Sequence, residues 1–177
     1  VRYQTPSQGK TAIIIPTRNR VDLLQAAVDS LLATTSSDAV ELFVVDHESN
    51  EPDTLEYLES LAKEHTVIRY TGSFNFSRIN NLAVSNVSDR CDTMLFLNND
   101  IEAITPDWLQ SMLDKARRPD VGAVGATLLY PDNRIQHAGV IVALGIADHF
   151  MEEMPYANPY QQDLSATVLP WIVTREF

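Results

Sequence analysis

The chain has 177 residues, 45% of them hydrophobic and 8% aromatic, so it can bury one sizeable core and intrinsic disorder is excluded. Its formal net charge of −11 argues against nucleic acid as a partner, because affinity for a polyphosphate backbone comes mostly from Lys and Arg. No apolar run approaches the roughly 18 to 20 residues that span a bilayer, and the first ten residues lack the profile of a signal peptide, so we expect a cytoplasmic protein.

The first half of the chain alternates short apolar runs with segments of helical periodicity. Thr11–Pro16 is a β-branched run closed by proline, and Val21–Leu32 follows it with apolar residues at helical spacing. Further strands are predicted at Leu42–Val45, Thr66–Tyr70 and Met94–Leu97, and further helices after a cap at Asp53 and Glu56, over Phe76–Val84 and after the N-cap Thr105. Apolar strands that each precede a helix are typical of parallel strands covered on both faces. We therefore predict an α/β fold, a Rossmann-like, doubly wound, mostly parallel sheet with helices on both faces.

The texture of the sequence changes after Pro119. Val121–Leu129 is predicted as a strand rich in small residues, in which Gly122 and Gly125 would serve close packing. A turn at 130–133, a strand or strand pair over Ile135–Leu144 and a polar loop over Met151–Tyr160 would follow. The single cysteine, Cys91, excludes an internal disulfide and any zinc site built from several cysteines.

Polar side chains follow three of the predicted strands. They occur at Pro16–Arg20, at Asp46–Ser49 and at Asn98–Asp100. Because the carboxyl ends of parallel strands meet at one edge of a sheet, we expect these side chains to lie close together. A phosphorylated ligand of so acidic a chain would need local positive charge there, from an arginine, a helix N-terminus or a bound cation. The alternative is that each set consists of ordinary solvated turn residues.

Asp100 is the first candidate for a metal ligand. It stands with Asn98 and Asn99 at the end of an apolar run that we interpret as a buried strand. Mg²⁺ or Mn²⁺ in such places is typically held by one or two carboxylates plus phosphate oxygens of the substrate. Glu102 lies close by, but a solvated carboxylate is the simpler interpretation of it. An ordinary polar turn at the strand end is the alternative for the whole cluster.

Two familiar nucleotide signatures are absent from the sequence. No Gly-x-Gly-x-x-Gly follows the first strand, and there is no Gly-Lys-Ser/Thr phosphate loop. Five other motifs, in this order and spacing, together resemble the bacterial family 2 glycosyltransferases with the GT-A fold, of the rhamnosyltransferase-like group. The motifs are Ile13–Arg20, Val44–Ser49, Phe74–Asn81, Phe96–Asp100 and Ile135–Val140.

The resemblance implies a single GT-A nucleotide-sugar-binding domain over residues 1–177, in which Mn²⁺ or Mg²⁺ bridges the phosphates of the donor. Asp46 would hydrogen-bond the base, Asp100 would be the metal ligand and His137 is a candidate contact to the sugar or the acceptor. By position in the motifs, the nucleotide-binding residues would be Pro16, Thr17, Arg18, Asp46, Asn81, Asn98 and Asn99. The chain departs from the simplest pattern in having Asn98 at the first position of the Asp-x-Asp motif and His47 after Asp46.

The resemblance implies an inverting transfer of a sugar from a UDP- or dTDP-sugar to a saccharide or lipid-linked saccharide acceptor. The product would be a polysaccharide or glycolipid precursor. Peripheral membrane association of the full-length protein is a further expectation. The catalytic base would lie beyond Phe177, in a C-terminal acceptor-binding part that this chain is expected to lack. No catalytic residue is therefore assigned. A noncatalytic nucleotide-sugar-binding module is the alternative. A nucleotidyltransferase is a third, although it would normally present a Gly-rich phosphate loop after the first strand.

Overall fold

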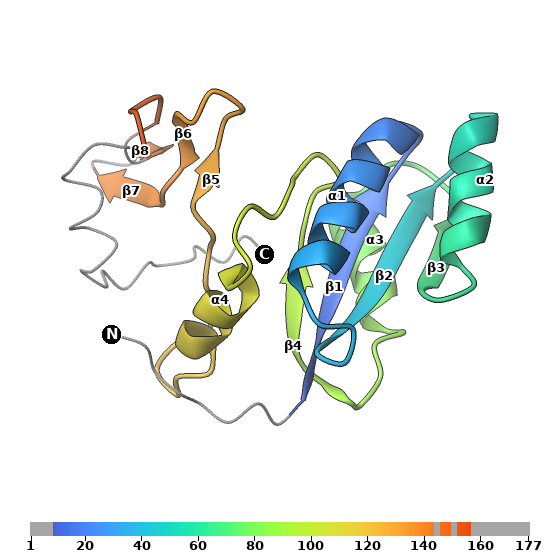
Figure 1. The fold of residues 1–177 in the computed structure, drawn as a ribbon, viewed down its shortest axis with the longest axis horizontal. Coiled ribbons are helices and arrows are strands. Elements are labelled where there is room, and N and C mark those ends of the chain that lie inside the picture. Colours follow the sequence, from blue (N-terminus) through green and yellow to red (C-terminus); the bar gives the residue numbers. More distant parts are fainter. Residues whose placement is uncertain (1–8, 144–145, 150–151, 157–177) are drawn as a thin grey trace. The chain divides into compact units, whose positions relative to one another are not determined.

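The computed structural model describes residues 9–143, 146–149 and 152–156, and the chain divides into two compact units with the boundary between Trp108 and Leu109. The first unit contains an alternating series of strands and helices (Figure 1). These are β1 (Lys10–Thr17), α1 (Val21–Thr34), β2 (Val40–His47), α2 (Pro52–Leu61), β3 (Thr66–Tyr70), α3 (Phe76–Val84) and β4 (Cys91–Phe96).

The strands of the first unit form one parallel sheet in the order β3-β2-β1-β4. Within the sheet the chain passes from the inner strand β1 outward through β2 to β3, and then returns to the other side of β1 with β4. The order therefore reverses between β1 and β4, which is where doubly wound sheets commonly bind their ligands. Helices α1 and α2 lie on one face of the sheet and α3 on the other (Figure 1). The predicted doubly wound α/β fold is confirmed.

Strand β1 lies at the centre of the core, and its residues from Thr11 to Ile15 are all buried. Ala12 and Ile14 belong to a cluster with Ile79 and Ala83 of α3. Because successive side chains of a strand point to opposite faces, Ile13 and Ile15 face the helices on the other side. Each fully buried isoleucine contributes about 1.5–3 kcal/mol, so the apolar run of β1 is used on both faces.

Strand β4 differs from the sequence interpretation, which made it a buried strand. Its residues alternate in burial, and the side chains of Met94 and Phe96 are 45% and 49% exposed. The reason is its place at the edge of the described sheet, next to β1 only, while α3 contacts β1, β2 and β3. An apolar run alone does not tell a central strand from an edge strand.

Helix α2 also begins differently from the expectation of a cap at Asp53 and Glu56. Pro52 is the first helical residue, and Glu51 is the N-cap without a side-chain capping hydrogen bond. Proline suits this first position because its missing N–H would have no partner there in any case.

The second unit holds short antiparallel strands. Strand β5 (Leu128–Leu129) pairs with β6 (Ile135–His137), and β7 (Val140–Ala143) pairs with β8 (Ile146–His149). The strand or strand pair expected over Ile135–Leu144 is found as two strands, β6 and β7, which pair with β5 and β8 and not with each other. Leu144 lies outside the described residues. Residue 151 and residues 157–160 of the loop expected over Met151–Tyr160 also lie outside them, whereas residues 152–156 form turns and an isolated bridge.

The strand predicted over Val121–Leu129 is wrong for most of its length. Only Leu128 and Leu129 are in a strand, and residues 121–127 are irregular. Glycine and other small residues give a strand little side-chain surface to pack, which weakens it. The close packing expected at Gly122 and Gly125 is also absent, since a Cβ at either position would have nothing within 4 Å.

Helix α4 (Trp108–Ala116) begins three residues after its expected N-cap, Thr105. Residues 105–107 form a turn instead, closed by a hydrogen bond from the Trp108 N–H to the Thr105 carbonyl over 3.3 Å. Among the described residues, no helix combines the length and apolar character needed to cross a membrane.

Candidate functional site

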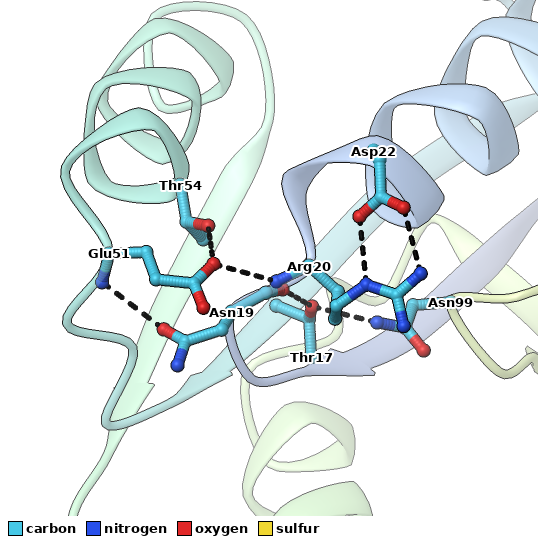
Figure 2. Close-up of polar contacts among 7 residues, drawn as sticks. All are labelled: Thr17, Asn19, Arg20, Asp22, Glu51, Thr54 and Asn99. Atoms are coloured by element: carbon cyan, nitrogen blue, oxygen red, sulfur yellow. Dashed lines mark hydrogen bonds and ion pairs between the residues drawn. The ribbon is translucent and has the colours of Figure 1, made fainter.

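The carboxyl ends of β1, β2 and β4 come together around Thr17. This buried residue is the register partner of Asp46 at the end of β2. From beyond β4, Asn99 Nδ2 donates a hydrogen bond to Thr17 Oγ1 over 3.1 Å (Figure 2). Polar side chains from three motifs therefore meet where the strand order reverses, as the sequence pattern predicts.

Asp46 is a buried carboxylate, only 3% exposed. Its Oδ1 accepts a hydrogen bond from the Ser49 N–H over 2.9 Å, within the tight turn after β2. Its Oδ2 lies 3.9 Å from Nε of Arg69 on β3, which is an ion-pair distance too long for a hydrogen bond. One oxygen of Asp46 is thus fixed by the backbone, and the other keeps acceptor capacity.

Asn19 joins the loop after β1 to the loop after β2. Its side-chain Oδ1 accepts from the N–H groups of Asn50, over 2.9 Å, and Glu51, over 3.2 Å. Its own N–H donates to Ser49 Oγ over 2.7 Å. In Figure 2 the Asn19 side chain points toward Glu51, whose carboxylate also accepts from the Arg20 N–H. The two loops that flank Asp46 are therefore held as one unit.

Three residues in these loops adopt left-handed backbone conformations. Asn19, Arg20 and Glu48 each have φ of 54°. Asparagine tolerates this region because its side chain can bond to nearby backbone, whereas arginine and glutamate adopt it at a cost of about 1 kcal/mol or more. Strained backbone of this kind often gathers at functional sites, and here it marks the ends of β1 and β2.

The two arginines after β1, Arg18 and Arg20, differ in their side-chain contacts. Arg20 donates to the Asp22 carboxylate from Nε and from its terminal nitrogen, over 3.0 and 2.8 Å. These hydrogen bonds lower the pKa of Asp22 and raise the pKa of Arg20. Arg18 is exposed and makes no hydrogen bond or ion pair to the described part of the chain. Arg18 is therefore the guanidinium that remains available to an anion.

The Asp-x-Asp-like motif lies in the turn after β4. Asn98 and Asp100 are exposed, while Asn99 is half-buried through its bond to Thr17. The described residues contain no group of three or more His, Cys, Asp or Glu side chains placed to hold a metal ion. Asp100 is thus an exposed carboxylate that belongs to no such group.

The Phe74–Asn81 motif contributes helix α3 and the loop before it. Asn75 caps the helix, since its Oδ1 accepts from the Arg78 N–H over 2.9 Å. Asn81 is exposed on α3, and its neighbour Asn80 is buried with an Oδ1 that has no partner among the described residues. Pro16 is half-buried in β1.

His47 occupies the position where the simplest family pattern has a second acidic residue. It is buried, and its Nε2 lies 2.9 Å from the Gly72 carbonyl. Its ring packs near those of Tyr70 and Phe74, with centroids 5.5 and 5.8 Å away. His47 therefore anchors the loop after β3 to the end of β2.

His137 belongs to β6 in the second unit, paired with Leu128, and is half-buried. Its contact with a sugar or an acceptor stays a prediction. The sequence places Asn19 and Ser49 among the polar strand ends but assigns neither of them a role in the site. The signal for them was weak, because an asparagine after a strand is also an ordinary turn residue, and their partners lie about thirty positions away.

Comparisons with known proteins bear on this arrangement. The chain matches the model of the family "Glycosyl transferase family 2" over residues 12–163. It is 46% identical over 150 residues to the uncharacterized protein y4gI of Sinorhizobium fredii, covering 81% of this chain and 16% of that protein. It is 40% identical over 165 residues to the O-antigen biosynthesis protein RfbC of Myxococcus xanthus, covering 90% of this chain and 13% of that protein. The chain thus spans only a small part of the length of these relatives.

Two solved structures are similar in fold. The mannosyltransferase PcManGT from Pyrobaculum calidifontis, in complex with GDP-Man and Mn²⁺, has a TM-score of 0.58 at 20% identity, over 71% of this chain and 37% of that one. GalNAc-T7 with UDP, GalNAc and Mn²⁺ has a TM-score of 0.53 at 14% identity, over 63% of this chain and 22% of that one. These similarities support the GT-A fold. Since the family model covers most of its residues, the chain belongs to glycosyl transferase family 2.

Proposed function

We propose that this chain is the donor-binding part of an inverting glycosyltransferase that uses a nucleoside diphosphate sugar, with uridine or thymidine as the nucleoside. The observation that carries the proposal is the meeting of Thr17, Asp46 and Asn99 at the reversal of strand order. In open α/β sheets this crevice is where nucleotides bind. The family membership gives the reaction class, the transfer of a glycosyl group.

In this proposal, different side chains bind different parts of the nucleotide-sugar donor. Asp46 Oδ2 would accept the single imide N–H of uracil or thymine, since its Oδ1 already accepts from Ser49. Uracil and thymine each present one imide N–H, and a single carboxylate oxygen is enough to accept it. Arg18 would meet the diphosphate, and Asn98 and Asn99 the ribose. Pro16 would line the pocket beside Thr17, and Asn81 would contact the nucleotide from α3.

A divalent cation fits these residues in one way. A site of one exposed carboxylate, Asp100, with amide neighbours does not make a closed protein cage. It suits Mn²⁺ or Mg²⁺ that shares its coordination with phosphate oxygens. When bound with the donor, such a cation supplies Lewis-acid stabilisation of the charge that develops on the departing diphosphate. The two similar solved structures named above each contain Mn²⁺.

The proposal for the acceptor is based on the relatives and not on contacts in the structure. We propose a saccharide or lipid-linked saccharide acceptor, because the Myxococcus relative is named for O-antigen biosynthesis. His137 is the candidate contact to the sugar or acceptor, and the residue that deprotonates the acceptor hydroxyl is unassigned. One nucleotide-sugar-binding domain over residues 1–177, action in the cytoplasm and peripheral membrane association of the longer protein belong to the same proposal.

Calorimetric titration of UDP, dTDP and GDP into the 177-residue chain tests the proposal. We expect UDP or dTDP to bind with Mn²⁺ present, to bind more weakly with chelator, and GDP to bind least. Preference for GDP would contradict uracil or thymine as the base. Absence of binding by all three nucleotides would contradict the donor site. Slow metal-dependent release of sugar from the preferred donor would distinguish a transferase from a noncatalytic binding module, which would bind the donor and leave it intact.

A further inference from the structure

The segment that follows β4 is tied to helix α1 by two hydroxyl groups. The Ala103 N–H donates a hydrogen bond to Ser30 Oγ over 3.0 Å, and the indole Nε1–H of Trp108 donates to Thr34 Oγ1 over 3.1 Å. We refer to residues 97–108 as the Asp100 loop. Ser30 and Thr34 lie one turn apart on α1, so both reach the same side of the helix.

The geometry of each hydroxyl fixes its role as an acceptor. Ser30 Oγ donates its one proton to the Ala27 carbonyl over 2.8 Å, and Thr34 Oγ1 donates to the Ser30 carbonyl over 2.7 Å. A hydroxyl has a single proton and two lone pairs. With the proton engaged by the helix itself, the lone pairs of each oxygen are left to receive the N–H of the loop.

Two more contacts hold the strand end of the Asp100 loop. The Leu97 N–H donates to the Ile14 carbonyl over 3.0 Å, and Asn99 is bonded to Thr17. Asp100 therefore lies between fixed points at Asn99 and Ala103. The Ile104 side chain is 72% exposed, whereas Leu97, Ile101 and Trp108 are half-buried. Polar contacts to β1 and α1 therefore add to partial apolar packing in holding the loop.

We propose that Ser30 and Thr34 are positioning residues, which hold the Asp100 loop so that Asp100 stands at the carboxyl end of the sheet. This inference rests on the proposed role of Asp100 toward the cation and the donor diphosphate. Neither hydroxyl touches the donor in this assignment. Each acts through the backbone or the indole of the loop.

Hydrogen exchange in the 177-residue chain tests whether the hydroxyls hold the loop. Thr34→Val removes the acceptor at nearly constant volume, Thr34→Ser keeps it, and Ser30→Ala removes the partner of the Ala103 N–H. Thr35→Val is the matched control, since Thr35 Oγ1 has no hydrogen-bond partner among the described residues. We expect Thr34→Val and Ser30→Ala to accelerate exchange over residues 97–108 by roughly fivefold, as loss of one hydrogen bond predicts, with β1 unaffected and the other two variants like wild type.

Equal exchange in the Asp100 loop of Thr34→Val, Ser30→Ala and wild type would overturn the proposal. So would acceleration spread evenly over the whole chain, because that would mark a structural role only. The second readout is the ratio of UDP or dTDP affinity with Mn²⁺ to that with chelator. It is expected to fall roughly fivefold in Thr34→Val and to recover in Thr34→Ser. A wild-type chain without metal-dependent binding would contradict the proposed function, while the exchange measurement still decides whether the hydroxyls hold the loop.

Discussion

Asn99 and Thr17 are 82 positions apart in the sequence, and one hydrogen bond joins them across the point where the strand order reverses. Thr17 Oγ1 also donates to the Asn19 carbonyl over 3.4 Å, so its lone pairs face Asn99. The bond couples the loop after β1, where we place the nucleotide, to the loop after β4, where we place the cation.

Replacing Thr17 tests this coupling. Thr17→Val keeps the shape of the buried side chain and leaves the Asn99 amide without its acceptor. We expect the metal-dependent affinity for UDP or dTDP to fall about five- to tenfold, which corresponds to one hydrogen bond. Thr17→Ser retains the hydroxyl and is expected to stay near wild type. Calorimetry on the three proteins makes the comparison, and equal affinities would show that the bond does not matter for binding.

Asp100 is expected to carry the dependence of donor binding on metal. Because its side chain is exposed, Asp100→Asn would leave the fold intact and change thermal stability little. Nucleotide affinity in the variant would no longer respond to chelator. Glu102→Gln is the matched control, two residues further along the same loop and also exposed. Loss of the metal response in Glu102→Gln instead would reassign the ligand.

Asn19 is expected to matter for stability through its backbone and its side chain. Asn19→Ala places alanine at φ of 54° and removes the acceptor of two N–H groups. We expect the free energy of unfolding to drop by roughly 1–2 kcal/mol. Asn19→Gly accepts the backbone conformation and loses only the side chain, so its cost is expected to be smaller. Urea unfolding gives both values, and a glycine variant less stable than the alanine variant would contradict the argument from backbone strain.

Tyr57 gives the chain a pH dependence at the alkaline end. Burial on α2, with a smaller effect of Asp29, raises the pKa of Tyr57 to about 12. The unfolded tyrosine has a pKa near 10, so between these values the unfolded chain releases a proton that the folded chain keeps. Stability from this residue is therefore complete below about pH 10 and lost as the pH rises toward 12.

Spectrophotometric titration of the tyrosines tests this expectation. We expect a late phenolate transition that disappears in Tyr57→Phe and persists in the control Tyr156→Phe, which changes an exposed tyrosine. Over the same pH range, the free energy of unfolding is expected to fall less steeply with increasing pH in Tyr57→Phe than in wild type. A single transition near pH 10 in wild type would contradict it.

Cys91 is expected to react slowly with thiol reagents. Burial raises the pKa of the Cys91 thiol, and the nearby Glu41 carboxylate raises it further. Because the thiolate is the reactive form, modification by a disulfide reagent at pH 8 is expected to be slower than that of free cysteine and to accelerate as the pH increases. Glu41→Gln is expected to quicken the reaction. A wild-type rate equal to that of free cysteine would contradict this assignment.

The sequence predicts the fold well where local pattern decides. The apolar run of β1 and the helical spacing of α1 and α3 are each visible within a window of about ten residues, and the polar strand ends follow from parallel topology. The exposure of Met94 and Phe96 was not predictable, because it depends on which strand lies at the edge of the sheet.

The site is predictable only in part. Thr17, Asp46 and Asn99 were identified through motifs, and the structure brings them together. The hydrogen bonds from Ala103 to Ser30 and from Trp108 to Thr34 join residues more than seventy positions apart. The sequence around a helical serine or threonine does not indicate whether its hydroxyl has such a distant partner. Asn19 was visible as a turn residue, but its left-handed backbone depends on the loop that it contacts.

The left-handed residues at the ends of β1 and β2 have a consequence for engineering this protein. Arg20 and Glu48 occupy a backbone region that glycine enters freely and β-branched residues strongly avoid. A library that randomises these two positions would therefore contain valine, isoleucine and threonine members that are destabilised by about 1–2 kcal/mol at each position. Restricting both positions to glycine, asparagine, aspartate and the native residue would keep the screened variants folded, so that differences among them report on recognition.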